Sequence, residues 1–146
     1  VSDGPGFFPT ATLEGAVYYS NLTERRTNRV EVSGDSVVSV EDAGFDGMHA
    51  FISPDESFVL VDARVGGEGA RADIFVAFRQ ENGEWTDLVN LGPTVNTEYS
   101  ETCPSLSPDG QFIFFSRYDE ANEVSNIYWV SARLIQAAMA DGPDGG

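Results

Sequence analysis

The chain has 146 residues, 41% hydrophobic and 12% aromatic, which is enough to bury a core and argues against disorder. Its net charge is −16, from 24 acidic and 8 basic residues, and this sign disfavours binding to nucleic acid or to an anionic membrane surface. The single cysteine excludes an internal disulfide, and no apolar run approaches the length of a membrane span.

Three copies of one repeat follow each other along the chain. The clearest pair is Ser53-Pro54-Asp55 and Ser107-Pro108-Asp109, an offset of 54 residues from Ser53 to Ser107. A degraded copy opens the chain, where residues 8–15 match residues 103–110. Self-similarity at such a period indicates a repeat architecture. The predicted units are a degraded repeat at 1–44, a full repeat at 45–98, an incomplete repeat at 99–131, and a closing helix with a tail at 132–146.

The Ser-Pro-Asp-Gly element predicts a tight turn that joins two strands of each repeat. Proline presets φ, aspartate bonds its own backbone, and glycine takes the left-handed position. Glu56 occupies the glycine position in the second repeat, where a left-handed backbone costs about 1 kcal/mol.

The strands that follow these turns are apolar at successive positions. They are predicted at residues 17–20, 58–62 and 112–116. Unbroken apolarity in a short strand indicates that both faces of the sheet are covered, as in the blades of a β-propeller. We therefore expect Phe114 and Phe115, which point to opposite faces, both to be buried.

A third strand is predicted in each repeat, at residues 29–32, 74–78 and 127–130. A fourth is predicted at residues 36–40 and 85–89, and the last repeat has none. Residues 131–140 are mostly good helix formers with apolar side chains at helical spacing, and Asp141-Gly142-Pro143 ends this helix.

The repeat, written (F/P)xxSPDGxxxxFxS followed by (D/N)IYxx, resembles the propeller repeat named for the periplasmic translocation protein TolB, often described as WD-repeat-like. Residues 49–57, 73–86, 90–93, 103–105 and 127–130 are similar to the C-terminal half of a group of exported bacterial propeller proteins. The resemblance covers essentially the whole chain. It implies a fold and not a function, because this fold serves both binding proteins and enzymes.

The predicted fold is therefore all-β. It consists of three consecutive four-stranded antiparallel propeller blades, the last incomplete, with a short C-terminal helix, and it forms half of a roughly six-bladed propeller. Because propellers usually have four to eight blades, the apolar faces at the two ends require self-association or covalent continuation of the chain.

Candidate ligand-binding residues lie near the expected innermost strands. His49 and Cys103 occupy equivalent repeat positions, where propeller residues face the central channel, and Asp46, Tyr99 and Glu101 are expected to line the same channel mouth. Tyr99 is also a candidate for stacking on a sugar ring. Structural roles, a metal or ligand contact, and a thiol–imidazole nucleophile remain open for His49 and Cys103, although a nucleophile and its base must lie within about 3 Å.

A glycine-rich loop at residues 66–69 precedes the third strand of the second repeat. It lacks the lysine and the following helix of a phosphate-binding loop, so it is predicted to be a long hairpin connection. Glu68 and Asp73 are weak candidates for a calcium site, since Ca²⁺ takes six to eight oxygen ligands.

The predicted function is that of a non-enzymatic propeller segment that binds a protein or a glycan in the bacterial envelope, in the periplasm or outside the cell, without a cofactor. The alternative is part of a propeller enzyme, either a glycan hydrolase or lyase or the gating propeller of a peptidase, with the catalytic residues outside this chain. The excess of acidic residues either keeps the protein soluble or indicates a site for a divalent cation or a basic partner.

Overall fold

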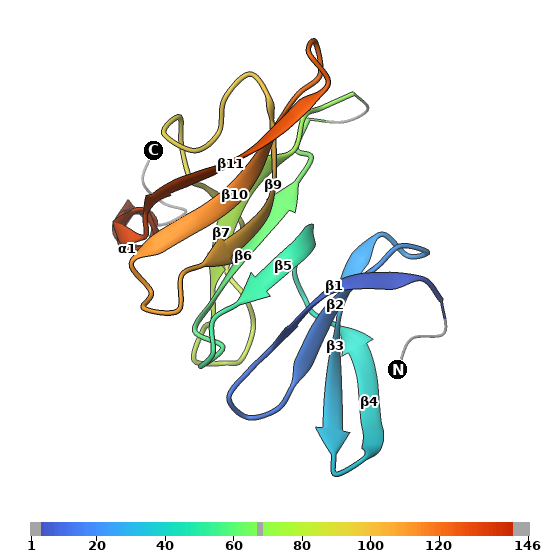
Figure 1. Cartoon of the computed structure of the whole chain (residues 1–146). Coiled ribbons are helices and arrows are strands. Elements are labelled where there is room, and N and C mark those ends of the chain that lie inside the picture. The colour runs from blue at the N-terminus through green and yellow to red at the C-terminus, as the bar shows by residue number, and fades with distance from the viewer. Residues whose placement is uncertain (1–3, 67–68, 142–146) are drawn as a thin grey trace.

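The computed structural model describes residues 4–66 and 69–141, which form three antiparallel sheets and one helix (Figure 1). The first sheet contains β1 (Gly6–Ala11), β2 (Val17–Asn21), β3 (Arg26–Ser33) and β4 (Ser36–Asp42). The second contains β5 (Met48–Ile52), β6 (Phe58–Ala63), β7 (Asp73–Phe78) and β8 (Val89–Asn90). The third contains β9 (Ser100–Leu106), β10 (Phe112–Asp119) and β11 (Val124–Ser131), and α1 (Arg133–Asp141) follows. Strands adjacent in sequence are adjacent in every sheet, which confirms the all-β antiparallel fold. Among the described residues the third sheet has three strands and the other two have four, so the last blade is incomplete as predicted.

The first strands of the three sheets lie side by side. β5 contacts both β1 and β9, so each sheet presents its first strand toward the same side and its later strands outward (Figure 1). This is the arrangement of successive blades in a partial propeller. The number of blades in a closed ring stays a prediction.

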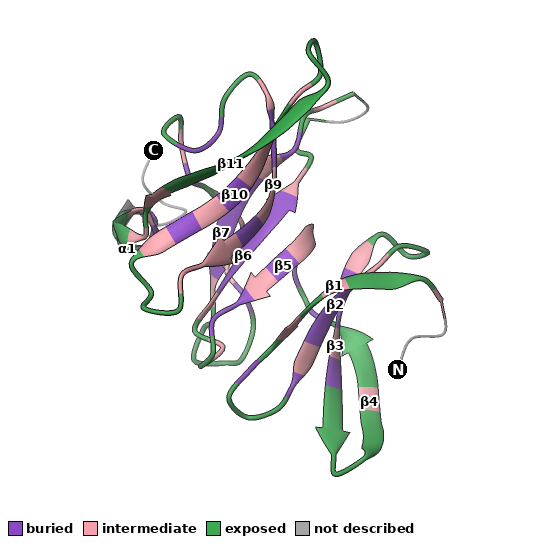
Figure 2. Ribbon diagram, in the orientation of Figure 1, coloured by how far each residue is buried: buried purple, intermediate pink, exposed green. Residues whose placement is uncertain are grey.

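The core lies between the blades rather than within them. One cluster, between the first two blades, includes Tyr18, Phe45, Val61 and Trp85. A second cluster joins the second blade to the third and to α1, and includes Leu60, Ile74, Ile113, Phe115 and Ile135. The central strand β6 supplies both clusters from its opposite faces, and Figure 2 shows it buried along most of its length. The doubly apolar strand is thus covered on both sides in the second blade.

The third blade differs, and the expectation for Phe114 is wrong. Phe115 is 2% exposed in the second cluster, but Phe114 is only half-buried. Phe114 pairs with Trp129 on the face that points away from the second blade, and within the described chain no further blade packs against that face. An apolar strand predicts two covered faces only where a blade stands on each side.

The fourth strand of the second blade is shorter than the predicted 85–89. Only Val89–Asn90 forms a strand, and Trp85 makes a single bridge to Arg79. The hydroxyl of Thr86 accepts the Phe78 N–H at 3.0 Å in place of a backbone carbonyl. The Trp85 indole is buried and donates to the Ala43 carbonyl at 3.0 Å, which ties the second blade to the segment that leaves the first.

Helix α1 begins two residues later than predicted. It buries Ile135 and Ala138 in the second cluster and leaves Met139 66% exposed. In the part of the chain that the structure describes, no helix is long and apolar enough to cross a membrane.

Glu56 adopts the left-handed backbone conformation expected for the glycine position of the turn, with φ 56°. Its carboxylate accepts hydrogen bonds from the Tyr18 hydroxyl and from Arg29 Nε, the latter at 3.2 Å. Both partners belong to the first blade. The residue that departs from the turn pattern therefore links two blades.

Candidate functional site at the inner strands

Phe8, His49 and Cys103 occupy one repeated position on the inner strands. Their φ angles are 55°, 47° and 55°, and each lies where the pairing of the first and second strands of its blade shifts register. A β-bulge re-aims the side chain of the extra residue. Three non-glycine residues with positive φ at matching positions indicate that the bulge belongs to the repeat itself.

In the second and third blades the bulge residue bonds to the second strand of the preceding blade. The His49 N–H donates to Ser20 Oγ at 2.9 Å, and the Cys103 N–H donates to Asp62 Oδ2 at 2.8 Å. Ser20 and Asp62 occupy equivalent positions in their blades, and Ser116 is the third member of this set. A side-chain oxygen at this position thus accepts the hydrogen bond that connects consecutive blades.

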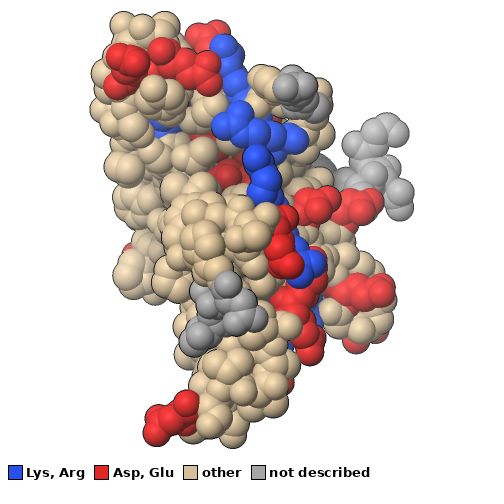
Figure 3. All heavy atoms as spheres, turned by 90° about the vertical axis from the view of Figure 1, so that its right-hand side faces the viewer, with Lys and Arg blue, Asp and Glu red and all other residues tan. Residues whose placement is uncertain are grey.

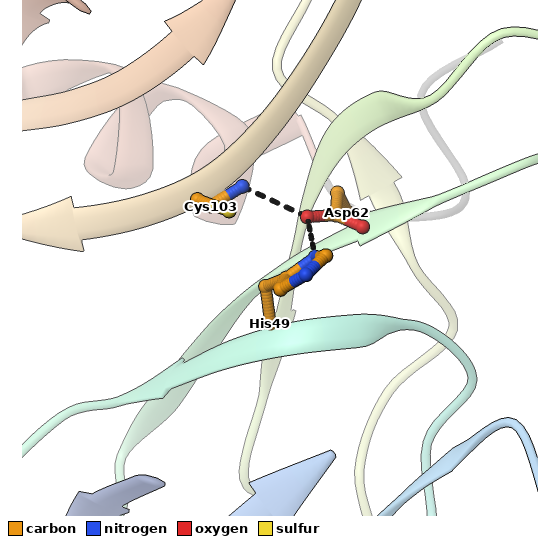
Figure 4. A group of neighbouring side chains, drawn as sticks. All are labelled: His49, Asp62 and Cys103. Atoms are coloured by element: carbon orange, nitrogen blue, oxygen red, sulfur yellow. Dashed lines mark hydrogen bonds and ion pairs between the residues drawn. The ribbon is translucent and has the colours of Figure 1, made fainter. Parts of the chain in front are cut away.

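At the second junction, between the second and third blades, the residue at this position is Asp62, which makes a further contact besides its hydrogen bond to Cys103. Asp62 Oδ2 also contacts His49 Nδ1 at 2.6 Å, and His49, Asp62 and Cys103 each place a nitrogen, oxygen or sulfur atom within 4.8 Å of the other two (Figure 4). The side chains of His49 and Asp62 are 20% and 7% exposed. We call these three residues the inner-strand cluster.

The electrostatics of the cluster favour charge on the histidine. Burial lowers the pKa of His49, but its hydrogen bond to the Asp62 carboxylate and its interaction with Cys103 outweigh burial and raise that pKa to about 10. The rings of Phe7 and Phe8 meet the imidazole edge-on, with centroids 4.8 and 5.3 Å away. These contacts fix the plane of the ring beside Asp62.

The predicted residue Asp46 is exposed beside the cluster. It lines an open hollow of about 340 Å³ together with Asp62, Arg25 and Arg64. Figure 3 shows the basic side chains gathered in one band on the face in view, with acidic groups along it. Arg26 pairs with Glu24 at 2.7 Å and with Asp42 at 2.9 Å. Carboxylates therefore neutralise part of the basic charge of the protein.

The other predicted residues lie apart from the cluster. Tyr99 is half-buried and lines an open hollow of about 300 Å³ with Arg71, Tyr118 and Asp119. Glu101 is fully buried, and its carboxylate pairs with Arg117 Nε at 2.7 Å. Having no exposed surface, Glu101 offers nothing for a ligand to contact.

Of the two calcium candidates, only Asp73 lies within the described residues, and Glu68 lies outside them. The carboxylate of Asp73 accepts a hydrogen bond from Asn90 Nδ2 at 2.9 Å, and within residues 4–66 and 69–141 Asp73 joins no group of three possible metal ligands. Asp62 was not among the residues predicted from the sequence. The repeat offset held the signal for it, because an acid stands where the other repeats carry Ser20 and Ser116.

Comparison with known proteins identifies no family. No family model matches the chain, and no curated protein matches it. The crystal structure of TolB from Acinetobacter baumannii is similar at a TM-score of 0.45 and 16% sequence identity, over 86% of this chain and 32% of that one. The chain thus spans about a third of the length of that protein.

Proposed function

We propose that this chain is a non-enzymatic propeller segment that binds a protein partner, a further β-propeller blade, through the outer face of its third sheet. We call this the open face and define it by Phe112, Phe114, Ile127 and Trp129. The observation that carries the proposal is the exposure of large apolar side chains there, with Ile127 71% and Trp129 62% exposed. Contiguous exposed apolar surface typically marks an interaction site.

Strand pairing places these side chains on one face. Phe114 pairs with Trp129 and Ser116 with Ile127, and the Phe112 and Trp129 rings meet edge-on at 5.0 Å. The opposite face carries Phe115 and is buried against the second blade. The open face therefore has the composition of an inter-blade surface.

Ser116 supplies a second, independent argument for a blade as the partner. Ser20 and Asp62, at the same repeat position, each accept the N–H of the bulge residue of the next blade. Ser116 lies on the open face, where its hydroxyl bonds that of Ser125 at 2.7 Å. A docking blade with the same bulge would place a backbone N–H at Ser116.

The free edge of β11 supports the same partner. In the first two sheets the third strand pairs with a fourth, whereas β11 pairs only with β10 among the described strands. An unpaired edge is a template for strand addition. Placement in the bacterial envelope is part of the proposal and rests on the resemblance of the repeats to exported proteins.

The test measures self-association, because the blade available in a solution of this chain is that of a second copy. We expect the mass measured by light scattering to rise with concentration, and the double variant Ile127→Ser/Trp129→Ser to remain monomeric. Leu13→Ser is the matched control, since Leu13 is 83% exposed outside the open face. A protein that stays monomeric over the whole concentration range would refute the proposal.

A glycan is the second candidate ligand, favoured by one observation. Tyr99 lines two open hollows, with Tyr118 beside one and Tyr128 beside the other. Aromatic rings flanked by polar groups suit a sugar ring. Binding of oligosaccharides that Tyr99→Ala abolishes, and that the open-face variant leaves unchanged, would favour this candidate over the protein partner.

A further inference from the structure

The inner-strand cluster contains more polar and charged groups than the hydrogen bond between two blades needs. At the first junction a serine hydroxyl suffices, because Ser20 Oγ accepts the His49 N–H. At the second junction Asp62 accepts the Cys103 N–H and also contacts His49, so one carboxylate oxygen meets both blades. At the first junction Ser20, Phe8 and His49 stand in the positions that Asp62, His49 and Cys103 occupy at the second. The first junction therefore has no carboxylate and no thiol at these positions.

We propose that His49, Asp62 and Cys103 form a binding site for a thiophilic divalent metal ion of the Zn²⁺ class. Zn²⁺ is bound in proteins by imidazole nitrogen, thiolate sulfur and carboxylate oxygen, which are the three donor types present. Donors around a tetrahedral Zn²⁺ lie about 3.5 Å apart. The three donor atoms already lie within 4.8 Å of one another, so small side-chain rotations bring them into range.

The surroundings suit an ion held by three protein ligands. The edges of Phe7 and Phe8 orient the His49 ring, as outer groups commonly orient metal-binding histidines. Asp62 also lines the open hollow of about 340 Å³, so one residue of the cluster borders solvent. Three protein ligands leave the fourth position to water or to a group of a bound molecule.

Charge also selects a divalent cation. A carboxylate and a thiolate together neutralise a doubly charged ion, and the ion takes the place of the proton that His49 holds beside Asp62, so that neutral imidazole is the third ligand. The mixed nitrogen, oxygen and sulfur set disfavours Ca²⁺ and Mg²⁺, which take oxygen ligands. The ion would join β5, β6 and β9, and so would connect the second blade to the third.

The experiment uses the whole chain with Zn²⁺ in calorimetry and Co²⁺ in absorption spectroscopy. We expect one ion per chain and a thiolate-to-cobalt charge-transfer band that Zn²⁺ abolishes. Asp62→Ser is the sharpest variant, because a serine at the equivalent position already bonds the next blade and should preserve the fold. Asp62→Ser should weaken Zn²⁺ binding roughly 100-fold, and Cys103→Ser should remove the charge-transfer band.

Matched controls separate this site from general attraction of cations to an acidic protein. Asp46→Asn removes a carboxylate from the adjoining hollow, and Asp73→Asn removes the earlier calcium candidate, so both should bind Zn²⁺ as the unaltered chain does. Absence of the charge-transfer band, or equal loss of affinity in the control variants, would overturn the proposal. Rapid alkylation of Cys103 by iodoacetamide that Zn²⁺ does not slow would overturn it in favour of a reactive thiol. None of these outcomes depends on the open face.

Discussion

Replacing Glu56 tests whether an unfavourable turn residue is retained because it joins two blades. Its carboxylate accepts hydrogen bonds from Tyr18 and Arg29, and the Arg29 and Glu56 side chains are only 22% and 17% exposed. Hydrogen bonds to charged groups contribute about 1.5–3 kcal/mol each. Glu56→Gly loses two of them and relieves about 1–2 kcal/mol of left-handed backbone strain. We expect a net loss of about 3 kcal/mol in the free energy of unfolding.

The control for this prediction is Gly110→Glu. Gly110 occupies the same turn position in the third blade with φ 71°, and an added Cβ there meets nothing closer than Leu106 at 3.9 Å. This variant acquires the strain without partners on another blade and should lose about 1–2 kcal/mol. Urea titration followed by tryptophan fluorescence measures both values, with an unchanged slope as the sign of intact two-state unfolding. A Glu56→Gly variant more stable than the unaltered chain would refute the role of Glu56 as a link between blades.

The same contacts give Glu56 a pH signature. Burial raises its pKa, but hydrogen bonds from Tyr18 and Arg29 outweigh burial, so the pKa of Glu56 lies below its usual range. A depressed folded-state pKa contributes stability that is present above the unfolded value, about 4.3, and lost as pH falls through the folded value. The stability difference between the unaltered chain and Glu56→Gln should therefore shrink below about pH 4. A difference that stays constant through this range would contradict the assignment.

Three further predictions concern buried contacts. Phe115→Ala should lower the free energy of unfolding in urea by about 3–5 kcal/mol, and Phe114→Ala should lower it clearly less. The reason is that Phe115 is buried and Phe114 lies on the open face. Equal losses in the two variants would contradict this difference. Asn96→Asp should lower the thermal midpoint, since the buried Asn96 amide donates to a backbone carbonyl at 2.8 Å that a carboxylate would repel; an unchanged midpoint would argue against that bond. Arg117→Ala should lower the free energy of unfolding by about 3–5 kcal/mol in chemical denaturation, because it leaves the buried Glu101 carboxylate without its cation. A loss below about 1 kcal/mol would show that solvent reaches Glu101.

The site was only partly predictable from sequence. The repeat offset identified His49 and Cys103 as equivalent residues, and the structure brings both to Asp62. Glu101 lies two residues before Cys103, yet it points into a buried ion pair with Arg117. Neighbours along a strand face opposite sides, and a bulge changes which side each residue faces. A list of residues near one strand therefore mixes members of the site with residues of the core.

The sequence by itself determined the repeats, the turns and the class of strand. These features depend on short-range chemistry, namely the conformations of proline, aspartate and glycine in a turn and the apolar character of consecutive strand residues. Only the tertiary structure decided that Phe115 is buried and Phe114 is not, and that Thr86 shortens the fourth strand of the second blade. Only the tertiary structure joined Asp62 to Cys103, 41 residues further along the chain. Contacts between blades depend on the packing of distant segments, which turn chemistry and strand composition do not specify.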